Sequence, residues 1–115
     1  MDRILTFGKC FADPIAIRIM RVTYRMPSTI QDLQTILELD RHTVDLRLLK
    51  LREAAILRPR QDGRWLSYEM NQEMRPVIKG LITSFYDEVK WSPDCLEDDR
   101  RYQELKASRT ADQDS

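Results

Sequence analysis

A polar helix that runs directly into a short hairpin is the feature that most constrains the fold of this chain. Over residues 41–54, Val44, Leu48 and Leu51 recur at the i, i+4, i+7 spacing of one buried helical stripe. Asp40 stands just before this segment, where its side chain can accept hydrogen bonds from the free N–H groups of a first helical turn. The other side chains are largely basic or polar, so we predict a helix whose outer face stays exposed.

The hairpin follows this helix at once. Asp62-Gly63 separates two strand-forming stretches, 58–61 and 64–70, and glycine permits the positive φ that a tight turn requires. Alternation along the second stretch puts Trp65 and Tyr68 on opposite faces, and we expect Trp65 to pack beneath the hairpin. An exposed helix beside a hairpin is typical of a winged helix-turn-helix, in which the helix enters the major groove of DNA and the hairpin contacts the flanking backbone.

The rest of the chain has helical patterns. Capping residues and apolar periodicity predict five further helices, over 3–11, 14–25, 30–37, 71–91 and 96–108. The predicted fold is therefore mainly α with a two-stranded β-wing, in the order four helices, two strands, two helices. We expect residues 1–91 to form the winged helix-turn-helix domain and 92–115 to form a polar helix with a flexible tail, frayed from Arg109. Apolar faces on the terminal helices indicate that they dimerise with a second copy.

Charge is distributed unevenly along the chain, although its formal net charge is zero. Between Arg41 and Arg64 there are seven lysines and arginines against three acids, whereas between Ser92 and Ser115 there are seven acids against four bases. Positive charge therefore gathers on the helix and hairpin, as phosphate binding requires. A merely solvated charged face would have the same composition, so charge alone does not decide between them.

Several classes of protein are disfavoured by the sequence. No apolar run approaches the roughly 18 residues of a membrane span, and no signal segment opens the chain, so we expect a cytoplasmic protein without membrane contacts. Two cysteines cannot make the disulfide framework of a small secreted domain. A Gly-rich phosphate loop, a metal-ligand cluster and a nucleophile–base pair around the single histidine, His42, are all missing, so we do not expect an enzyme.

The outer face of the helix supplies most candidate DNA contacts, because the buried stripe fixes which side chains point outward. These candidates are Arg41, His42, Thr43, Asp45, Leu46, Arg47 and Lys50. The three basic residues among them can reach guanine edges or phosphates, and the Thr43 methyl group can meet a thymine. His42 has two interpretations of equal weight, a donor to the DNA or a solvent-exposed turn residue.

Two of these positions are unusual for a helix that faces DNA. A carboxylate repels phosphate, so we interpret Asp45 as an orienting partner for Arg41 or Arg47. Leu46, together with Leu49, is more apolar than expected, so that either these leucines contact thymine methyls or the helix docks on a protein. The hairpin tip supplies the remaining candidates, Arg60, Gln61, Gly63 and Arg64. Its two arginines are expected to contact phosphates or the minor groove.

Three blocks of sequence resemble the ArsR/SmtB family of bacterial winged-helix repressors. They are F-A-D-P-I-A-I-R-I-M at Phe11–Met20, the segment Ile30–Asp45, and L-K-L-R-E-A-A-I-L followed by D-G-R-W-L-S-Y-E-M within Leu49–Met70. The resemblance covers roughly residues 4–91. It implies a homodimeric repressor that binds a double-stranded DNA operator and is often released by a metal, a metalloid or an oxidant.

The chain also departs from the family pattern. The family's C-x-C metal motif would fall on Thr29 and Gln31, which are not soft ligands, and the long helix after the hairpin has no histidine for the second family site. No metal site is therefore expected. Glu38 and Ala55 stand where the family has glycine, in the turn before the exposed helix and just after that helix.

The two thiols offer a different switch. In the family, the elements that carry Cys10 and Cys95 meet at the dimer interface, so the resemblance implies that the two could pair within or between subunits. Such a pair could bind trivalent arsenic or form a regulatory disulfide. The alternative is that both are unrelated small buried residues.

The sequence is compatible with two functions from different classes. The leading one is a sequence-specific DNA-binding transcriptional regulator, a homodimeric repressor of a bacterial operon, relieved by a thiol-binding metalloid or an oxidant. The alternative is a winged-helix module that binds a protein and not DNA, which zero net charge and the outer leucines favour.

Overall fold

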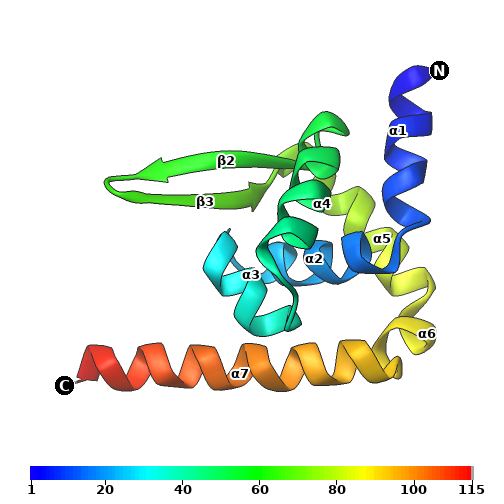
Figure 1. Cartoon of the computed structure of the whole chain (residues 1–115). Coiled ribbons are helices and arrows are strands. Elements are labelled where there is room, and N and C mark those ends of the chain that lie inside the picture. The colour runs from blue at the N-terminus through cyan, green and yellow to red at the C-terminus, as the bar shows by residue number, and fades with distance from the viewer. Residues whose placement is uncertain (115) are drawn as a thin grey trace.

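The computed structural model describes residues 1–114, with side chains to residue 111 (Figure 1). Its elements, in chain order, are α1 Asp2–Phe11, α2 Pro14–Arg25, β1 Ser28–Thr29, α3 Ile30–Leu37, α4 Arg41–Glu53, β2 Leu57–Asp62, β3 Trp65–Met70, the 3-10 turn η1 Gln72–Met74, α5 Arg75–Ser84, α6 Tyr86–Lys90 and α7 Pro93–Asp114. The predicted mainly α fold with a two-stranded wing is confirmed. Within these residues, no helix is both long enough and apolar enough to cross a bilayer.

Capping side chains start the helices that form the helix-turn-helix. Asp13 accepts from the Ile15 amide at 3.0 Å and opens α2, with Pro14 at its first position. Thr29 and Asp32 form a reciprocal capping box at the start of α3. Asp40 accepts from the Thr43 amide at the start of α4. These caps fix where α3 and α4 begin, and hence how the two helices meet.

The core lies behind α4. Val44, Leu48 and Leu51 are all buried, which confirms the predicted inner stripe of this helix. They pack with apolar side chains from α2, α3 and the base of the wing, such as Ile19 and Leu33. Burial of this stripe on one side leaves the opposite side of α4 at the surface.

The wing is the antiparallel hairpin β2–β3, in register from Leu57↔Met70 to Asp62↔Trp65. Its two-residue turn is Gly63-Arg64, one position later than predicted, and Gly63 has the left-handed φ of 58°. The two-residue strand β1 adds to the other edge of β3 and gives the sheet order β1-β3-β2. Two residues are too few to show alternation, so this strand had no signal in the sequence.

The helix predicted over residues 71–91 is wrong as a single element. The Asn71 side chain does not accept a capping hydrogen bond. Its Nδ2 donates to the Ala55 carbonyl at 2.6 Å instead. After η1 the chain forms α5 and then α6, and Phe85, with φ −113° and ψ 30°, breaks the helix between them. No residue of α6 is buried, so packing does not hold α6 in line with α5.

The C-terminal helix is longer and better packed than its polar composition indicated. It begins at Pro93 and continues through Asp114, beyond the predicted end at residue 108. It crosses α3 on the way to the side from which the wing projects (Figure 1), with Tyr102 buried in the contact. Arg109, expected to begin a frayed tail, pairs with Asp32 at the start of α3.

Candidate nucleic-acid interface

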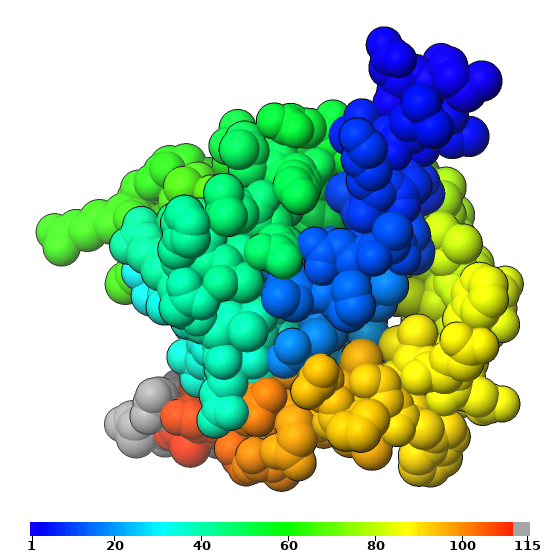
Figure 2. Space-filling view, turned by 45° about the vertical axis from the view of Figure 1, so that its right-hand side comes forward, coloured from blue at the N-terminus to red at the C-terminus, as the bar shows by residue number. Residues whose placement is uncertain are grey.

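The outer face of α4 is open to solvent. Figure 2 shows this helix, coloured between cyan and green, uncovered in the middle of the molecule, with the wing projecting to one side. The predicted contacts that are exposed on the helix are Arg41, His42, Asp45, Leu46 and Lys50, whereas Thr43 and Arg47 are half-buried. No other element of residues 1–114 covers this face in Figure 2, so the surface needed to enter a groove is free.

The first turn of α4 is organised by its two aspartates. Asp45 lies 3.6 Å from the Arg41 guanidinium, at the distance that its interpretation as an orienting partner requires. The Thr43 hydroxyl donates to Asp40 at 2.5 Å, so it serves the cap and leaves its methyl group for contacts outside. This side-chain bond, together with the Thr43 amide, lowers the pKa of Asp40 and keeps the capping carboxylate charged.

Arg47 is placed differently from its prediction as a DNA contact. Its Nε donates to Asp13 Oδ2 at 2.9 Å, and the Arg47 side chain is only 27% exposed. It therefore ties α4 to the cap of α2. Lys50 stays exposed, and its backbone carbonyl lies 3.8 Å from the Cys10 sulfur.

The wing holds paired and unpaired cations. Arg58 pairs with Glu69 at 2.7 Å, and Arg60 lies 3.0 Å from Asp62 and 3.5 Å from Glu69. Arg64, at the tip, is exposed and makes no ion pair with any side chain that the structure describes. The guanidinium of Arg64 is therefore more available to a phosphate than the paired guanidinium groups of Arg58 and Arg60 in the middle of the wing.

The other predicted tip residues are also at the surface. Gln61 is exposed, and its Nε2 donates to the Gly63 carbonyl at 2.8 Å, which stiffens the turn. Trp65 is 68% exposed, so the prediction that it packs beneath the wing is wrong. Its neighbours on that face of the hairpin are Asp62, directly opposite, and Arg60 and Ser67, and these leave the indole largely uncovered.

Sequence reasoning missed one cation of this surface. Arg52 is exposed on α4 and forms no ion pair with the described side chains. Arg41, Asp45 and Leu49 form one row along the surface of α4, and Arg52 continues this row. Helical spacing alone could therefore have identified it. Leu46 and Leu49, at 42% and 52% exposure, lie on the same outer surface.

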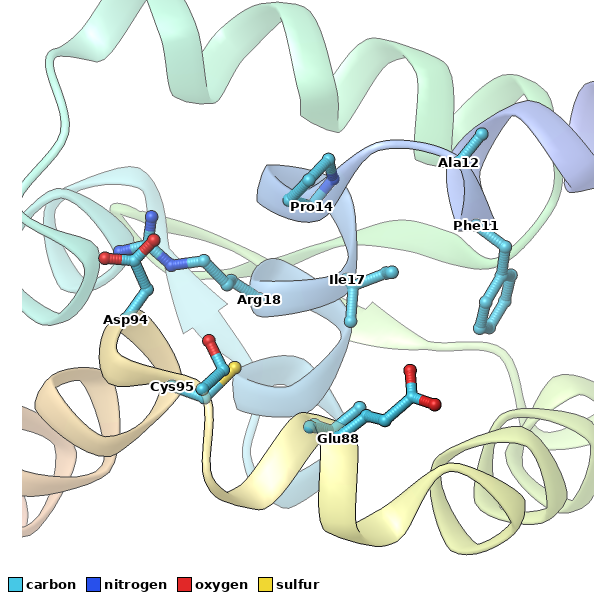
Figure 3. A pocket seen from close by; sticks show the side chains of 10 residues that line it. Phe11, Ala12, Pro14, Ile17, Arg18, Glu88, Asp94 and Cys95 are labelled. Atoms are coloured by element: carbon cyan, nitrogen blue, oxygen red, sulfur yellow. The ribbon is translucent and has the colours of Figure 1, made fainter.

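The two thiols line separate pockets of the chain. Cys10, at the end of α1, is buried against α4 and lines a pocket with Lys50 and Glu53. Burial raises the pKa of the Cys10 thiol, and the nearby Asp13 carboxylate raises it further. Cys95, in the first turn of α7, is buried beside a separate pocket of about 350 Å³ (Figure 3). The two pockets share no lining residue, and both cysteines are free.

The pocket beside Cys95 is walled by α1, α2, α6 and the start of α7. Figure 3 shows Ile17 and Phe11 on one side, with Glu88 pointing in from α6. Within the described residues, no group of three or more His, Cys, Asp or Glu side chains is arranged to hold a metal ion. The candidate site is the exposed surface of α4 and the wing.

Comparison with known proteins supports the same assignment. No protein-family model matches the chain. The chain is 31% identical over 91 residues to the arsenic resistance transcriptional regulator ArsR1 of Pseudomonas putida strain KT2440, an alignment that covers 76% of this chain and 71% of that protein.

Solved structures share the fold. HlyU from Vibrio cholerae N16961 superposes with a TM-score of 0.65 at 18% identity, over 73% of this chain and 92% of HlyU. The homodimeric winged helix-turn-helix DNA-binding domain of Mb0332 from Mycobacterium bovis has a TM-score of 0.69 at 13% identity, over 80% of this chain and 86% of that domain. The Pseudomonas relative is a transcriptional regulator, and its similarity shows that this chain belongs to the ArsR family of transcriptional regulators.

Proposed function

We propose that the chain is a homodimeric repressor of a bacterial operon that binds an operator through α4 and the wing. One observation carries the proposal: α4 buries an apolar stripe, and its open outer face holds cations that form no ion pair with any described side chain, beside a wing whose tip holds another. These cations are Lys50, Arg52 and Arg64. A surface of this kind neutralises phosphates while the first turn of the helix reads bases.

The first turn of α4 is the part that reads sequence in this proposal. Arg41 is held in place by Asp45, so its guanidinium presents donors to a guanine edge with less loss of side-chain entropy. His42 lies beside it and is also exposed. Lys50 and Arg52, farther along the helix, supply phosphate contacts that strengthen binding to any duplex.

Dimerisation rests on apolar side chains that the single chain leaves exposed. Ile4 and Leu5 on α1, Phe85 and Tyr86 at the α5–α6 break, and Trp91 are each at least half exposed. A second copy would bury them and would set two α4 helices against successive major grooves of a palindromic site. The homodimeric state of the Mb0332 domain supports this arrangement.

Release from DNA through the thiols is part of the same proposal, and we place the protein in the cytoplasm, where thiols stay reduced. Because Cys10 and Cys95 line separate pockets of one chain, a bridge between them by arsenic(III) or oxidation would involve two subunits or a rearrangement. Titration of the DNA complex with arsenite and with peroxide tests this step. Equal responses of the parent, Cys10→Ser and Cys95→Ser would exclude it.

Selection of duplexes from a random pool tests DNA binding itself. We expect one enriched palindromic sequence, and we expect Arg41→Ala to weaken its binding about tenfold, as for one lost base contact. Arg100→Ala is the matched control, because Arg100 lies on α7 and pairs with Glu97 and Glu104 away from α4. The protein-binding alternative predicts a different result. No duplex would then be enriched, and the chain would self-associate or capture a protein in a way that depends on Leu46 and Leu49.

A further inference from the structure

The turn between α3 and α4 has an unusual backbone for its sequence. Glu38 ends α3 in the left-handed region, with φ 53° and ψ 49°. Side chains with a β-carbon are strained there, and glycine is the residue that usually ends a helix in this way. The last carbonyl groups of a helix also lack partners within the helix. Something outside α3 must therefore stabilise this end.

Two arginines from other elements fill this role. Arg18 of α2 donates through Nη2 to the Leu37 carbonyl at 2.9 Å, and Arg101 of α7 donates through Nε to the Ile36 carbonyl. The Arg101 guanidinium also lies 3.4 Å from the Glu38 carboxylate. Charged donors on the last carbonyls complement the negative end of the helix dipole. The strained residue and the end of α3 are thus held by the same guanidinium.

Asp98 joins the two arginines into one unit. Its carboxylate is fully buried and accepts two bonds from Arg18, at 2.7 Å and 2.8 Å, and one from Arg101 at 3.2 Å. These bonds raise the pKa of Arg18, so its charge persists despite burial. A fully buried carboxylate between two arginines tolerates little displacement, because a shift breaks charge-assisted hydrogen bonds that water cannot replace there.

The residues that follow this turn belong to α4, the recognition helix of the proposed function. Leu39 and Asp40 are all that separate Glu38 from Arg41, and Asp40 is the cap of α4. A rotation at Glu38 therefore tilts the first turn of α4. The neighbouring acid Asp99 is a natural contrast, because its carboxylate pairs with Arg21 and Arg25 of α2 at 3.0 Å and, among the described side chains, forms no ion pair with α3.

We propose that Arg18, Asp98 and Arg101 are positioning residues for the recognition helix α4. They stabilise the end of α3 at a turn where glycine is the usual residue, and they set the angle at which α4 leaves that turn. The proposal rests on the proposed DNA-binding function. It gives the acidic helix α7 a defined part in operator recognition through Asp98 and Arg101.

The test compares Arg101→Gln with Asp99→Asn in the full-length protein. We expect Arg101→Gln to weaken binding to the selected duplex about tenfold, and to change binding to an unrelated duplex by less than about twofold, since phosphate contacts remain. Asp99→Asn should leave both affinities unchanged. Loss of both affinities in equal proportion, or the same loss in Asp99→Asn, would reduce the role to general stability and overturn the proposal.

A second substitution supplies the rescue. In the Arg101→Gln background, Glu38→Gly removes the backbone strain and the unpaired carboxylate, so we expect it to restore binding to the selected duplex. Failure of that rescue in a variant with native circular dichroism would contradict the compensation we describe.

If the parent protein prefers no duplex, the proposed function fails, and amide exchange still tests the turn. The Val44 amide, which donates to the Asp40 carbonyl at 3.2 Å in the first turn of α4, should then exchange faster in Arg101→Gln than in Asp99→Asn, and equal rates would overturn the proposal.

Discussion

Arg47 Nε donates to Asp13 Oδ2 across 2.9 Å and joins the recognition helix to the first turn of α2. The other oxygen of the same carboxylate accepts from the Ile15 amide. One aspartate therefore caps α2 and anchors α4. The outward position of Arg47 on α4 predicts a DNA contact, and the structure assigns its guanidinium to the protein instead.

Arg47→Ala should consequently lower stability. The pair is partly exposed, with side chains 27% and 21% accessible, so we expect a loss of about 0.5–1 kcal/mol in the free energy of unfolding. Asp13→Ala should cost about 1 kcal/mol more, because it also removes the cap of α2. Urea unfolding of both single variants and the double variant measures the coupling. Additive losses would mean that the pair does not form in solution and that Arg47 is free for DNA.

Ala55 and Gly63 have the same positive φ, which predicts opposite effects on stability when alanine is replaced by glycine at one position and glycine by alanine at the other. Each has φ of 58°, in the region that favours glycine. Ala55→Gly should raise the free energy of unfolding by about 0.5–1 kcal/mol, and Gly63→Ala should lower it by about 1 kcal/mol. A β-carbon at Gly63 would meet no atom within 4 Å, so the second effect is conformational and not steric. Thermal melts check both, and a destabilised Ala55→Gly variant would contradict the argument.

Local signals in the sequence predicted the local parts of this structure. The inner stripe at Val44, the caps at Asp13 and Asp40 and the wing turn at Gly63 each depend on residues only a few positions apart. Periodicity and cap chemistry act over that range, so these features could be predicted with the fold class.

Long-range pairs could not be predicted in this way. Asp98 is one of several acids in a polar helix, and nothing in its neighbourhood shows that its partner is Arg18, 80 residues earlier. The same applies to Arg47 and its carboxylate on α2. Exposure of Trp65 was missed because alternation tells which face a side chain is on but not whether another element covers that face. The break at Phe85 likewise reflects missing packing on α6.

The buried thiol of Cys10 predicts a pH dependence above neutrality. Burial raises its pKa above the ordinary value of 9.0, so in the folded state the neutral thiol is favoured. Its contribution to stability is complete below pH 9.0 and is lost as the pH rises through the higher pKa of the folded protein. Urea midpoints should therefore fall more steeply above that pH in the parent than in Cys10→Ala. Parallel curves would show that the thiol titrates normally.

Unequal pairing of the wing arginines predicts unequal effects on DNA binding. Arg60 is already neutralised by Asp62 and Glu69, whereas Arg64 has no acidic partner among the described side chains. Arg64→Ala should therefore weaken binding to the selected duplex several-fold and reduce the slope of log K against log[salt] by about 1. Arg60→Ala should change both quantities less, because the Arg60 guanidinium is already paired with acids of the wing and contributes less to neutralising phosphates. Fluorescence anisotropy over a range of salt concentrations measures the slopes, with Arg100→Ala as the control on α7. Equal slopes for parent and Arg64→Ala would place the wing tip away from the phosphates and leave α4 as the source of the electrostatic contacts.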